Sequence, residues 1–317
     1  MEGRLIILPR DGVHQTSVFL SGTASRCILV VGSQSEGLFA SPYVQALAEL
    51  VKGTWSLAQV VLGSSYVGRG APDHEADADD VDAALAVLAK EHGVREAVLY
   101  ASGTGVQVAL AVMASAPRAS MVTRLVLQGG IVAPQSSKLF SVAATRRRVE
   151  TARALTAAKR GDDAAAMAGE YDMTVTPARL HRNAILTVQE AVWQPVVGES
   201  DATCRETLRG VTVPTLFLLS TEASYTKVAT AAVPEVQRAA RDAIGQPADD
   251  VQVSLIAATV DEHRRLLRGN AALAVHTVVE FLQSADARRE QREAAAMALA
   301  VEAERKKRVE LAKALCA

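Results

Sequence analysis

The sequence predicts an α/β protein built on a mostly parallel, doubly wound sheet. Short runs rich in Val, Ile and Leu alternate along the chain with segments whose apolar residues recur at helical spacing. Several runs are almost continuously apolar, as expected for strands that are covered on both faces. The first two runs are instead separated by a polar turn with Asp11-Gly12, which predicts an antiparallel hairpin ahead of the parallel strands.

The strands expected in chain order are residues 4–8, 16–20, 27–32, 57–62, 96–100, 124–128, 215–219 and 251–257. The helices expected are residues 43–51, 79–90, 105–113, 138–160, 162–170 and 269–282. The segment 79–90 opens with an acidic turn, which favours the positive end of a helix dipole, and Gly93 follows its end. Because no strong strand candidate falls between about 133 and 210, this stretch is predicted to be a helical cap insertion over one end of the sheet.

The composition changes after Ser284. Residues 286–316 contain no Gly or Pro and are rich in Ala, Glu, Arg and Lys, so helix propensity is high throughout. We therefore expect residues 1–284 to form the α/β domain and 285–317 to form an extra, charged C-terminal helix. Both a solvated tail and a partner-binding arm fit this pattern, and a thin apolar stripe suits docking better than self-burial.

The bulk composition excludes several classes of protein. The 317 residues include 34 basic and 35 acidic ones, so no net field attracts nucleic acid or an anionic membrane. No apolar run is long enough to span a bilayer, and the N-terminus lacks the pattern of a signal peptide. Three scattered cysteines indicate a reducing compartment, so a soluble, intracellular protein is expected.

No metal or cofactor is expected from the sequence. The six histidines and three cysteines show no ligand spacing typical of a metal site. Gly103 and Gly105 open a predicted helix, as the first glycines of a dinucleotide-binding loop would, but Val108 stands where the third glycine belongs.

The segment 99–107 carries the chemistry of interest, because a buried strand runs through a tight turn of small residues into a helix. This is the setting of a nucleophile elbow, small-x-Ser-x-Gly, in an α/β-hydrolase fold. The elbow residues here are Ala101, Ser102, Gly103, Thr104 and Gly105. Gly103 stands at the nucleophile position and has no side chain, and Ser102 is one residue early.

Several motifs extend this likeness along the chain: Val30-Val31-Gly32, Glu36-Gly37-Leu38, Pro42-Tyr43-Val44, Trp55-Ser56-Leu57-Ala58-Gln59-Val60, Ser64-Ser65-Tyr66, Thr104-Gly105-x-Gln107 and Leu127-Gln128. With them, the stretch from about 3 to 283 resembles a eukaryotic α/β-hydrolase-like family of unknown function that is related to fungal siderophore esterases. The resemblance implies an α/β-hydrolase fold.

The resemblance also implies that this chain is a degenerate member of the family, a pseudo-enzyme. A Gly-His-Ser-Thr-Gly elbow would place the catalytic serine at Gly103. The catalytic acid would fall on Ala223, and the histidine would fall at or near Asp261. Removing a triad serine lowers turnover on the order of a millionfold.

Three functions follow from these patterns. The leading hypothesis is a non-catalytic binding or structural subunit of a larger assembly, with protein partners bound through residues 286–317. The second is a serine esterase with displaced catalytic residues, drawn from Ser35 or Ser102 with His263 and either Glu222 or Asp261. The third is a protein that binds a small molecule in the vestigial pocket under the helical insertion.

Overall fold

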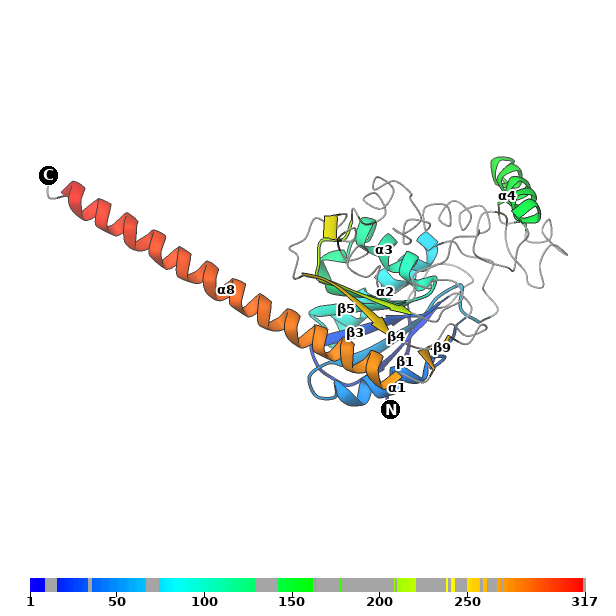
Figure 1. Ribbon diagram of the computed structural model, residues 1–317, viewed down its shortest axis with the longest axis horizontal. Coiled ribbons are helices and arrows are strands. Elements are labelled where there is room, and N and C mark those ends of the chain that lie inside the picture. The colour runs from blue at the N-terminus through cyan, green and yellow to red at the C-terminus, as the bar shows by residue number, and fades with distance from the viewer. Residues whose placement is uncertain are drawn as a thin grey trace. The chain divides into compact units, whose positions relative to one another are not determined.

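An eight-stranded sheet organises the first part of the chain (Figure 1). The computed structural model describes residues 1–8, 16–33, 36–66, 74–128, 142–161, 163, 177, 208, 210–220, 238, 241–242, 250–256, 259–260, 267–268 and 271–315. The chain divides into two units, Met1–Val275 and His276–Ala317.

The strands of the sheet are β1 (Arg4–Ile7), β2 (Ser17–Ser21), β3 (Arg26–Val31), β4 (Ser56–Val61), β5 (Glu96–Ser102), β6 (Val122–Gln128), β7 (Thr215–Ser220) and β8 (Val251–Ile256). Their order in the sheet is β1-β2-β4-β3-β5-β6-β7-β8. β1 pairs antiparallel with β2, and β2 pairs antiparallel with β4, whereas β4 to β8 are all parallel to their neighbours. This confirms the predicted sheet, including its antiparallel opening hairpin. β9 (Thr259–Val260) and β10 (Leu267–Arg268) form a separate antiparallel pair.

Helices cover both faces of the sheet (Figure 1). The helices of this unit are α1 (Pro42–Leu50), α2 (His74–His92), α3 (Gly105–Ser115) and α4 (Val142–Ala157), with a short 3-10 turn η2 (Ala119–Met121). On one face, Leu99 of β5 joins a core that includes Leu85 of α2 and Ala109 of α3. On the other face, Tyr43 of α1 contacts Tyr100 of β5, with ring centroids 5.4 Å apart. Successive side chains of β5 point to opposite faces of the sheet, so this strand contributes to the core on each face.

The element boundaries differ from the prediction at α2. The sequence predicts a helix from Asp79, whereas α2 begins at His74. Glu75 and Asp77 supply its acidic first turn, which satisfies the helix dipole five residues earlier than expected. Of the predicted cap insertion at 133–210, α4 is described, while the helix predicted at 162–170 lies outside the described residues.

The second unit is helical throughout its described part. α8 (Ala271–Leu315) is one continuous helix that begins in the first unit and ends near the C-terminus. The sequence predicts two helices with a break after Leu282, but Ser284 continues the helix and donates its hydroxyl to the Phe281 carbonyl oxygen at 3.0 Å. No Gly or Pro stands there to end the helix. The division between residues 284 and 285 therefore marks a change of composition and not a break in the helix.

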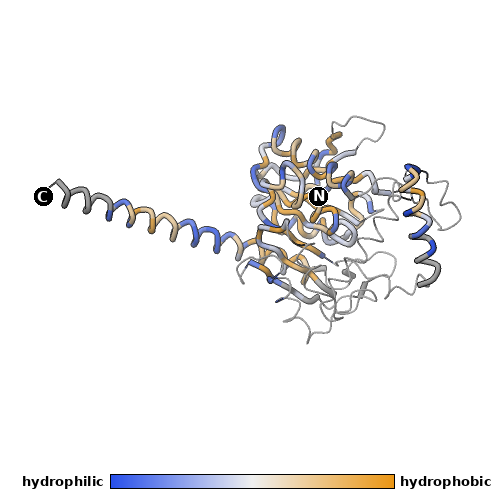
Figure 2. Tube along the Cα trace, turned by 90° about the horizontal axis from the view of Figure 1, so that it is seen from above, coloured by the Kyte–Doolittle hydropathy of each residue, from blue (hydrophilic) through white to orange (hydrophobic). Residues whose placement is uncertain are grey.

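Burial changes along α8. Val278, Phe281, Leu282 and Ala285 are buried, whereas every residue from Glu290 to Glu304 is exposed. Figure 2 shows hydrophilic and hydrophobic stretches following one another along this exposed part. Of the helices that the structure describes, α8 included, none has a stretch sufficiently apolar to cross a bilayer.

Candidate functional site

The carboxyl ends of three neighbouring strands meet at one edge of the sheet. β3 and β6 both pair in parallel with β5, which places Val31 beside Ala101 and Gln128 beside Ser102. The residues that follow these strands therefore lie together, as is usual for functional groups in open α/β sheets. The Gly103 amide donates to the Gln128 carbonyl oxygen at 3.0 Å and joins two of these ends.

The turn between β5 and α3 is a tight elbow with Gly103 at its apex. Gly103 has a φ of +55°, in the left-handed region that favours glycine. Two residues later, a Cβ on Gly105 would lie 2.5 Å from the Val31 carbonyl oxygen and 2.6 Å from that of Gly32. The absence of a side chain at Gly105 allows the first turn of α3 to pack directly on the end of β3. The structure therefore contains the strand–turn–helix geometry that the sequence predicts at 99–107.

The space beside the apex is filled by Ser33. A Cβ added to Gly103 would lie 2.6 Å from the Ser33 hydroxyl oxygen and 3.0 Å from the Ser33 Cβ. Real Cβ atoms essentially never approach another atom so closely, so a side chain at position 103 would require Ser33 to move. Ser33 also lies 3.1 Å, hydroxyl to hydroxyl, from Thr104. The apex therefore has no side chain of its own, and Ser33 would have to shift before position 103 could carry one.

Backbone donors at this edge are bound to side chains of the chain itself. The Thr104 amide donates to the Ser33 hydroxyl at 3.3 Å, and the Ser33 amide donates to Glu36 Oε2 at 2.7 Å. In α/β hydrolases the residue after the nucleophile and the loop after the third strand supply the N–H groups that stabilise an oxyanion. Here the amide of Thr104, and that of Ser33 in the loop after β3, already have acceptors within the chain.

A buried polar layer lies behind the elbow, on the face of the sheet that α1 covers. The Tyr100 hydroxyl donates to Gln128 Oε1 at 2.5 Å. Burial raises the pKa of Tyr43 to about 12. Burial, followed by the proximity of Tyr43, also raises the pKa of Tyr100. Both phenols are therefore neutral over the physiological pH range, and neither is poised to act as a base.

Two buried hydroxyl groups on the α1 side of this layer have no hydrogen-bond partner among the residues that the structure describes. Tyr43 Oη and Ser41 Oγ are buried and have no hydrogen-bond partner among those residues. A buried hydroxyl without a partner costs about 1–3 kcal/mol. The layer is therefore incompletely paired on the α1 side and well paired between Tyr100 and Gln128.

The structure places only some of the predicted site residues. Ala101 and Ser102 end β5 and are buried, and Thr104 and Gly105 follow the apex as predicted. Ser102 is only 5% exposed, so its hydroxyl is shielded from solvent. Five other candidates lie outside the described residues: Ser35, Glu222, Ala223, Asp261 and His263. No local motif marks Ser33 in the sequence, because its contact with the elbow depends on the parallel register of β3 with β5.

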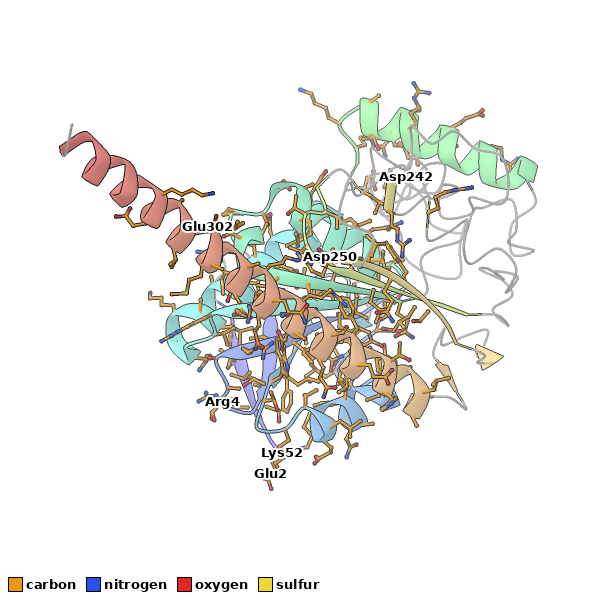
Figure 3. All side chains as sticks on the ribbon, turned by 60° about the vertical axis from the view of Figure 1, so that its left-hand side comes forward. Glu2, Arg4, Lys52, Asp242, Asp250 and Glu302 are labelled. Atoms are coloured by element: carbon orange, nitrogen blue, oxygen red, sulfur yellow. The ribbon has the colours of Figure 1, made fainter. Side chains whose placement is uncertain are left out.

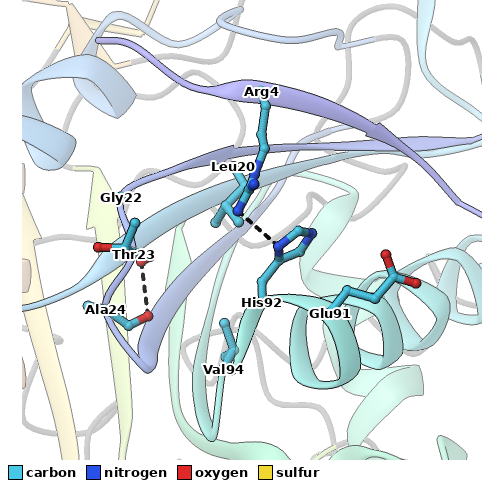
Figure 4. Close-up of a pocket in the computed structure, with 9 residues that line it drawn as sticks. Arg4, Leu20, Gly22, Thr23, Ala24, Glu91, His92 and Val94 are labelled. Carbon is cyan, nitrogen blue, oxygen red and sulfur yellow. Dashed lines mark hydrogen bonds between the residues drawn. The ribbon is translucent and has the colours of Figure 1, made fainter.

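A surface cavity of about 250 Å³ lies at the opposite edge of the sheet (Figure 4). Arg4 and His92 line it, with Arg4 Nη2 2.9 Å from His92 Nδ1. Ala24, Ser56 and Val94 also line it and stand at or just before the amino ends of β3, β4 and β5. This cavity therefore does not belong to the elbow.

Metal ligands are not grouped in the described part of the chain. Within those ranges, no three His, Cys, Asp or Glu side chains lie close enough together to hold a metal ion.

Comparison with known sequences gives a family. The family model described as "Protein of unknown function (DUF1749)" matches residues 13–192, which is more than half of the chain. A UPF0613 protein of Schizosaccharomyces pombe is 35% identical over 101 residues. That match spans 30% of this chain and 32% of the length of the yeast protein.

Comparison with solved structures gives the fold. An α/β-hydrolase-fold protein of unknown function is 33% identical and superposes with a TM-score of 0.76, covering 91% of this chain and 98% of its own. The siderophore hydrolase EstB of Aspergillus fumigatus is 14% identical with a TM-score of 0.61, covering 90% and 97%. A monoglyceride lipase of Saccharomyces cerevisiae is 10% identical with the same TM-score, covering 90% and 95%. The last two likenesses concern the fold alone.

Proposed function

We propose that this chain, which belongs to the DUF1749 family of proteins of unknown function and has an α/β-hydrolase fold, is not catalytic. It acts instead as a binding or structural subunit of a protein assembly. The fold alone does not decide activity, since function depends on the site that the fold carries.

The observation that carries the proposal is the glycine at the apex of the elbow, which packs closely against Ser33. A serine nucleophile needs its side chain at the apex, and Gly103 offers none. The room that such a side chain needs is occupied by Ser33, whose hydroxyl would lie 2.6 Å from a Cβ at position 103. The elbow is therefore packed as a structural turn.

The hydrogen bonds at the same edge support this interpretation. An oxyanion site works when preorganised donors point at an empty position where charge develops. The Thr104 amide points instead at Ser33, and the Ser33 amide points at Glu36. A substrate carbonyl would have to displace internal acceptors from both donors.

The remaining triad positions support the proposal from the sequence. The family resemblance assigns the acid to Ala223 and the histidine to the neighbourhood of Asp261. A nucleophile without a base and an orienting acid is not activated.

A serine-reactive fluorophosphonate probe tests the loss of catalysis. The purified chain is expected to remain unlabelled beside an active serine hydrolase treated in the same way, and Gly103→Ser is expected to remain unlabelled as well. Labelling of the wild-type chain that disappears in Ser35→Ala or Ser102→Ala would show a displaced nucleophile and refute the proposal.

The binding role is proposed for the exposed part of α8. Met297, Leu299 and Val301 are 72%, 68% and 62% exposed within a short stretch of this helix, and apolar side chains gathered in this way can bind a protein partner. A native pull-down compares the full chain with one ending at residue 285. A stoichiometric assembly that is lost on truncation is the expected result, and identical monomeric behaviour of both forms would contradict the binding role.

A further inference from the structure

The cavity at the amino ends of the parallel strands brings together segments that are far apart in the chain (Figure 4). This basal cavity lies between Arg4 of β1, the turn at 22–24, Ser56 of β4 and the segment 91–94 at the end of α2. Its volume of about 250 Å³ approaches that of pockets for small molecules, which is roughly 300–1,000 Å³. It therefore has room for a small organic ligand.

The deep part of the basal cavity is apolar and held by internal hydrogen bonds. Leu20 and Val94 line it and are each 3% exposed. The Val94 amide donates to the Leu88 carbonyl oxygen at 3.1 Å, and the Ser56 hydroxyl donates to the Ala24 carbonyl oxygen at 3.0 Å. Because this lining is already fixed, a ligand would not have to order it on binding.

A glycine allows one wall of the basal cavity to pack closely. Gly22, in the turn between β2 and β3, has a φ of +92°, in the region that favours glycine. A Cβ added there would lie 3.2 Å from both the Cα and the Oγ of Ser56. The wall formed by this turn therefore rests directly on the start of β4.

Arg4 brings a positive charge to the mouth of the basal cavity. Its side chain is exposed at the surface of this unit (Figure 3). Arg4 Nη2 donates to His92 Nδ1 at 2.9 Å. A guanidinium group has no acceptor, so His92 Nδ1 carries no proton in this contact and the ring proton is on Nε2. The guanidinium is thus held in place by an uncharged partner.

No acid neutralises this guanidinium in the part of the chain that the structure describes. The contact with His92 is the one hydrogen bond of the Arg4 side chain there, and Arg4 forms no ion pair with a described residue. Glu91 also lines the cavity, but its carboxylate points away from Arg4 in Figure 4. Most of the five N–H donors of the guanidinium are therefore open to a ligand.

The contact between Arg4 and His92 is not arranged for stability alone. His92 Nε2 is buried and has no hydrogen-bond partner among the described residues. A buried donor without an acceptor destabilises the folded state, so such a group calls for a further explanation. Presentation of Arg4 to a ligand supplies one.

The charges around the basal cavity favour a monoanion. Among the described residues that line it, there is no Lys and no second Arg. Glu91 and the negative end of the α2 dipole oppose a dianion such as phosphate. The planar fork of one guanidinium matches one carboxylate group through two parallel hydrogen bonds.

We propose that the basal cavity binds a small organic monocarboxylate, with the carboxylate on Arg4 and an apolar body on Leu20 and Val94. His92 acts as a positioning residue that holds the guanidinium. This site lies apart from the elbow and involves no residue of α8 beyond 275, so it goes beyond the function proposed above.

Titration of the full-length protein with 3-methylbutanoate at low ionic strength tests the proposal by ligand-observed NMR. A dissociation constant in the roughly millimolar range is expected for so small a probe. The Hε1 resonance of His92, assigned by its loss in His92→Asn, is expected to shift with the same midpoint. The uncharged 3-methylbutanamide and inorganic phosphate are each expected to bind at least about tenfold more weakly.

Substitution of Arg4 tests the anchor. Arg4→Gln is expected to weaken binding of 3-methylbutanoate at least about tenfold, and Arg4→Lys is expected to weaken it less, because a lysine keeps the charge and loses the fork. Arg95→Gln is the matched control, since Arg95 is exposed, lies outside the lining and carries the same charge. It is expected to leave the affinity unchanged.

Substitution of His92 tests the positioning. His92→Phe removes the acceptor of Arg4 and is expected to weaken binding about threefold. His92→Asn is expected to bind more tightly than His92→Phe, because an amide oxygen can replace Nδ1 as acceptor. Equal affinities of these two variants would show that the contact does not position Arg4.

Three outcomes overturn the proposal. They are no saturable binding of 3-methylbutanoate up to about ten times the expected dissociation constant, equal binding by Arg4→Gln and the wild type, and binding of the amide or of phosphate as tight as that of the carboxylate. None of them bears on the elbow or on the exposed part of α8, because no variant used here alters either one.

Discussion

At position 103 two separate effects oppose a side chain. The positive φ disfavours every residue except glycine, at a cost of about 1–3 kcal/mol. The contact with Ser33 adds a steric cost that depends on how far Ser33 can move. Gly53 offers a comparison, because it has a φ of +85° and nothing within 4 Å of an added Cβ.

We expect Gly103→Ala to destabilise the protein by at least about 1 kcal/mol more than Gly53→Ala. Gly53→Ala carries the backbone strain alone, and Gly103→Ala carries the strain and the clash. Urea unfolding at equilibrium measures both free energies. In a double-mutant cycle, Gly103→Ala is expected to cost less in a Ser33→Gly background than in the wild type, and equal losses at Gly103 and Gly53 would show that Ser33 relaxes freely.

Ionisation of Tyr43 is expected to lower the free energy of unfolding at alkaline pH. Its pKa is about 12 in the folded protein and 10.0 in the unfolded chain, so between these values only the unfolded state releases the proton. The unfolded state then binds fewer protons, and the free energy of unfolding falls by about 1.4 kcal/mol per pH unit from this group.

Tyr43→Phe is therefore expected to flatten the loss of stability between pH 10 and pH 12 without lowering the stability at pH 7. The hydroxyl that it removes has no hydrogen-bond partner among the described residues. Urea unfolding across this pH range measures the slope. A slope identical to that of the wild type would show that Tyr43 titrates normally.

At the scale of elements, two aspartates of α2 hold the turn that follows β4. Asp77 accepts from the Ser64 amide at 3.1 Å and from the Ser64 hydroxyl at 2.7 Å. Asp80 accepts from the Gly63 amide at 2.8 Å. Both carboxylates are fully buried, so these bonds bring the strand end and the helix together in a region shielded from water.

We expect Asp77→Ala to destabilise the protein by about 1–3 kcal/mol, because it leaves the buried Ser64 donors without their acceptor. Asp79→Ala is the matched control on the same helix, since Asp79 is exposed, and its expected effect is within about 0.5 kcal/mol. Thermal unfolding of the two variants compares them. Similar effects would show that the carboxylate of Asp77 is not needed to hold the turn.

The elements were predictable because each has a local cause. The apolar run of β3 and the small residues of the elbow can be recognised in the sequence. Strands that alternate with helices then predict a parallel sheet, as the structure has from β4 to β8. The start of α2 at His74 and the continuity of α8 through Ser284 were not predicted. Helix propensity changes gradually along such segments, so composition alone does not fix their ends.

The site was predictable only in part. Gly103 at an elbow can be recognised from neighbouring residues, whereas the contact of Ser33 with that elbow joins positions 70 residues apart. Such a contact depends on the register of β3 with β5 and on the path of the loop after β3. No local pattern encodes either feature.

At the scale of the whole molecule, the exposed part of α8 contributes little to the free energy of unfolding of the rest of the chain. From Glu290 to Glu304 no residue is buried. An exposed helical segment contributes little to the cooperative unfolding of a buried core.

A chain ending at Arg289 is therefore expected to keep the urea midpoint of the full chain when both are compared at the same low protein concentration. Tryptophan fluorescence can follow unfolding, since Trp55 is buried. A lower midpoint for the shorter chain would show that residues 290–317 stabilise the remainder.

The close approach of Ser33 to position 103 also limits how this sequence can change over generations. A serine gained first at position 103 meets the Ser33 hydroxyl, and a smaller residue gained first at position 33 removes the acceptor of the Thr104 amide. Positions 33 and 103 are therefore expected to change together, because a replacement at either one alters the surroundings of the other.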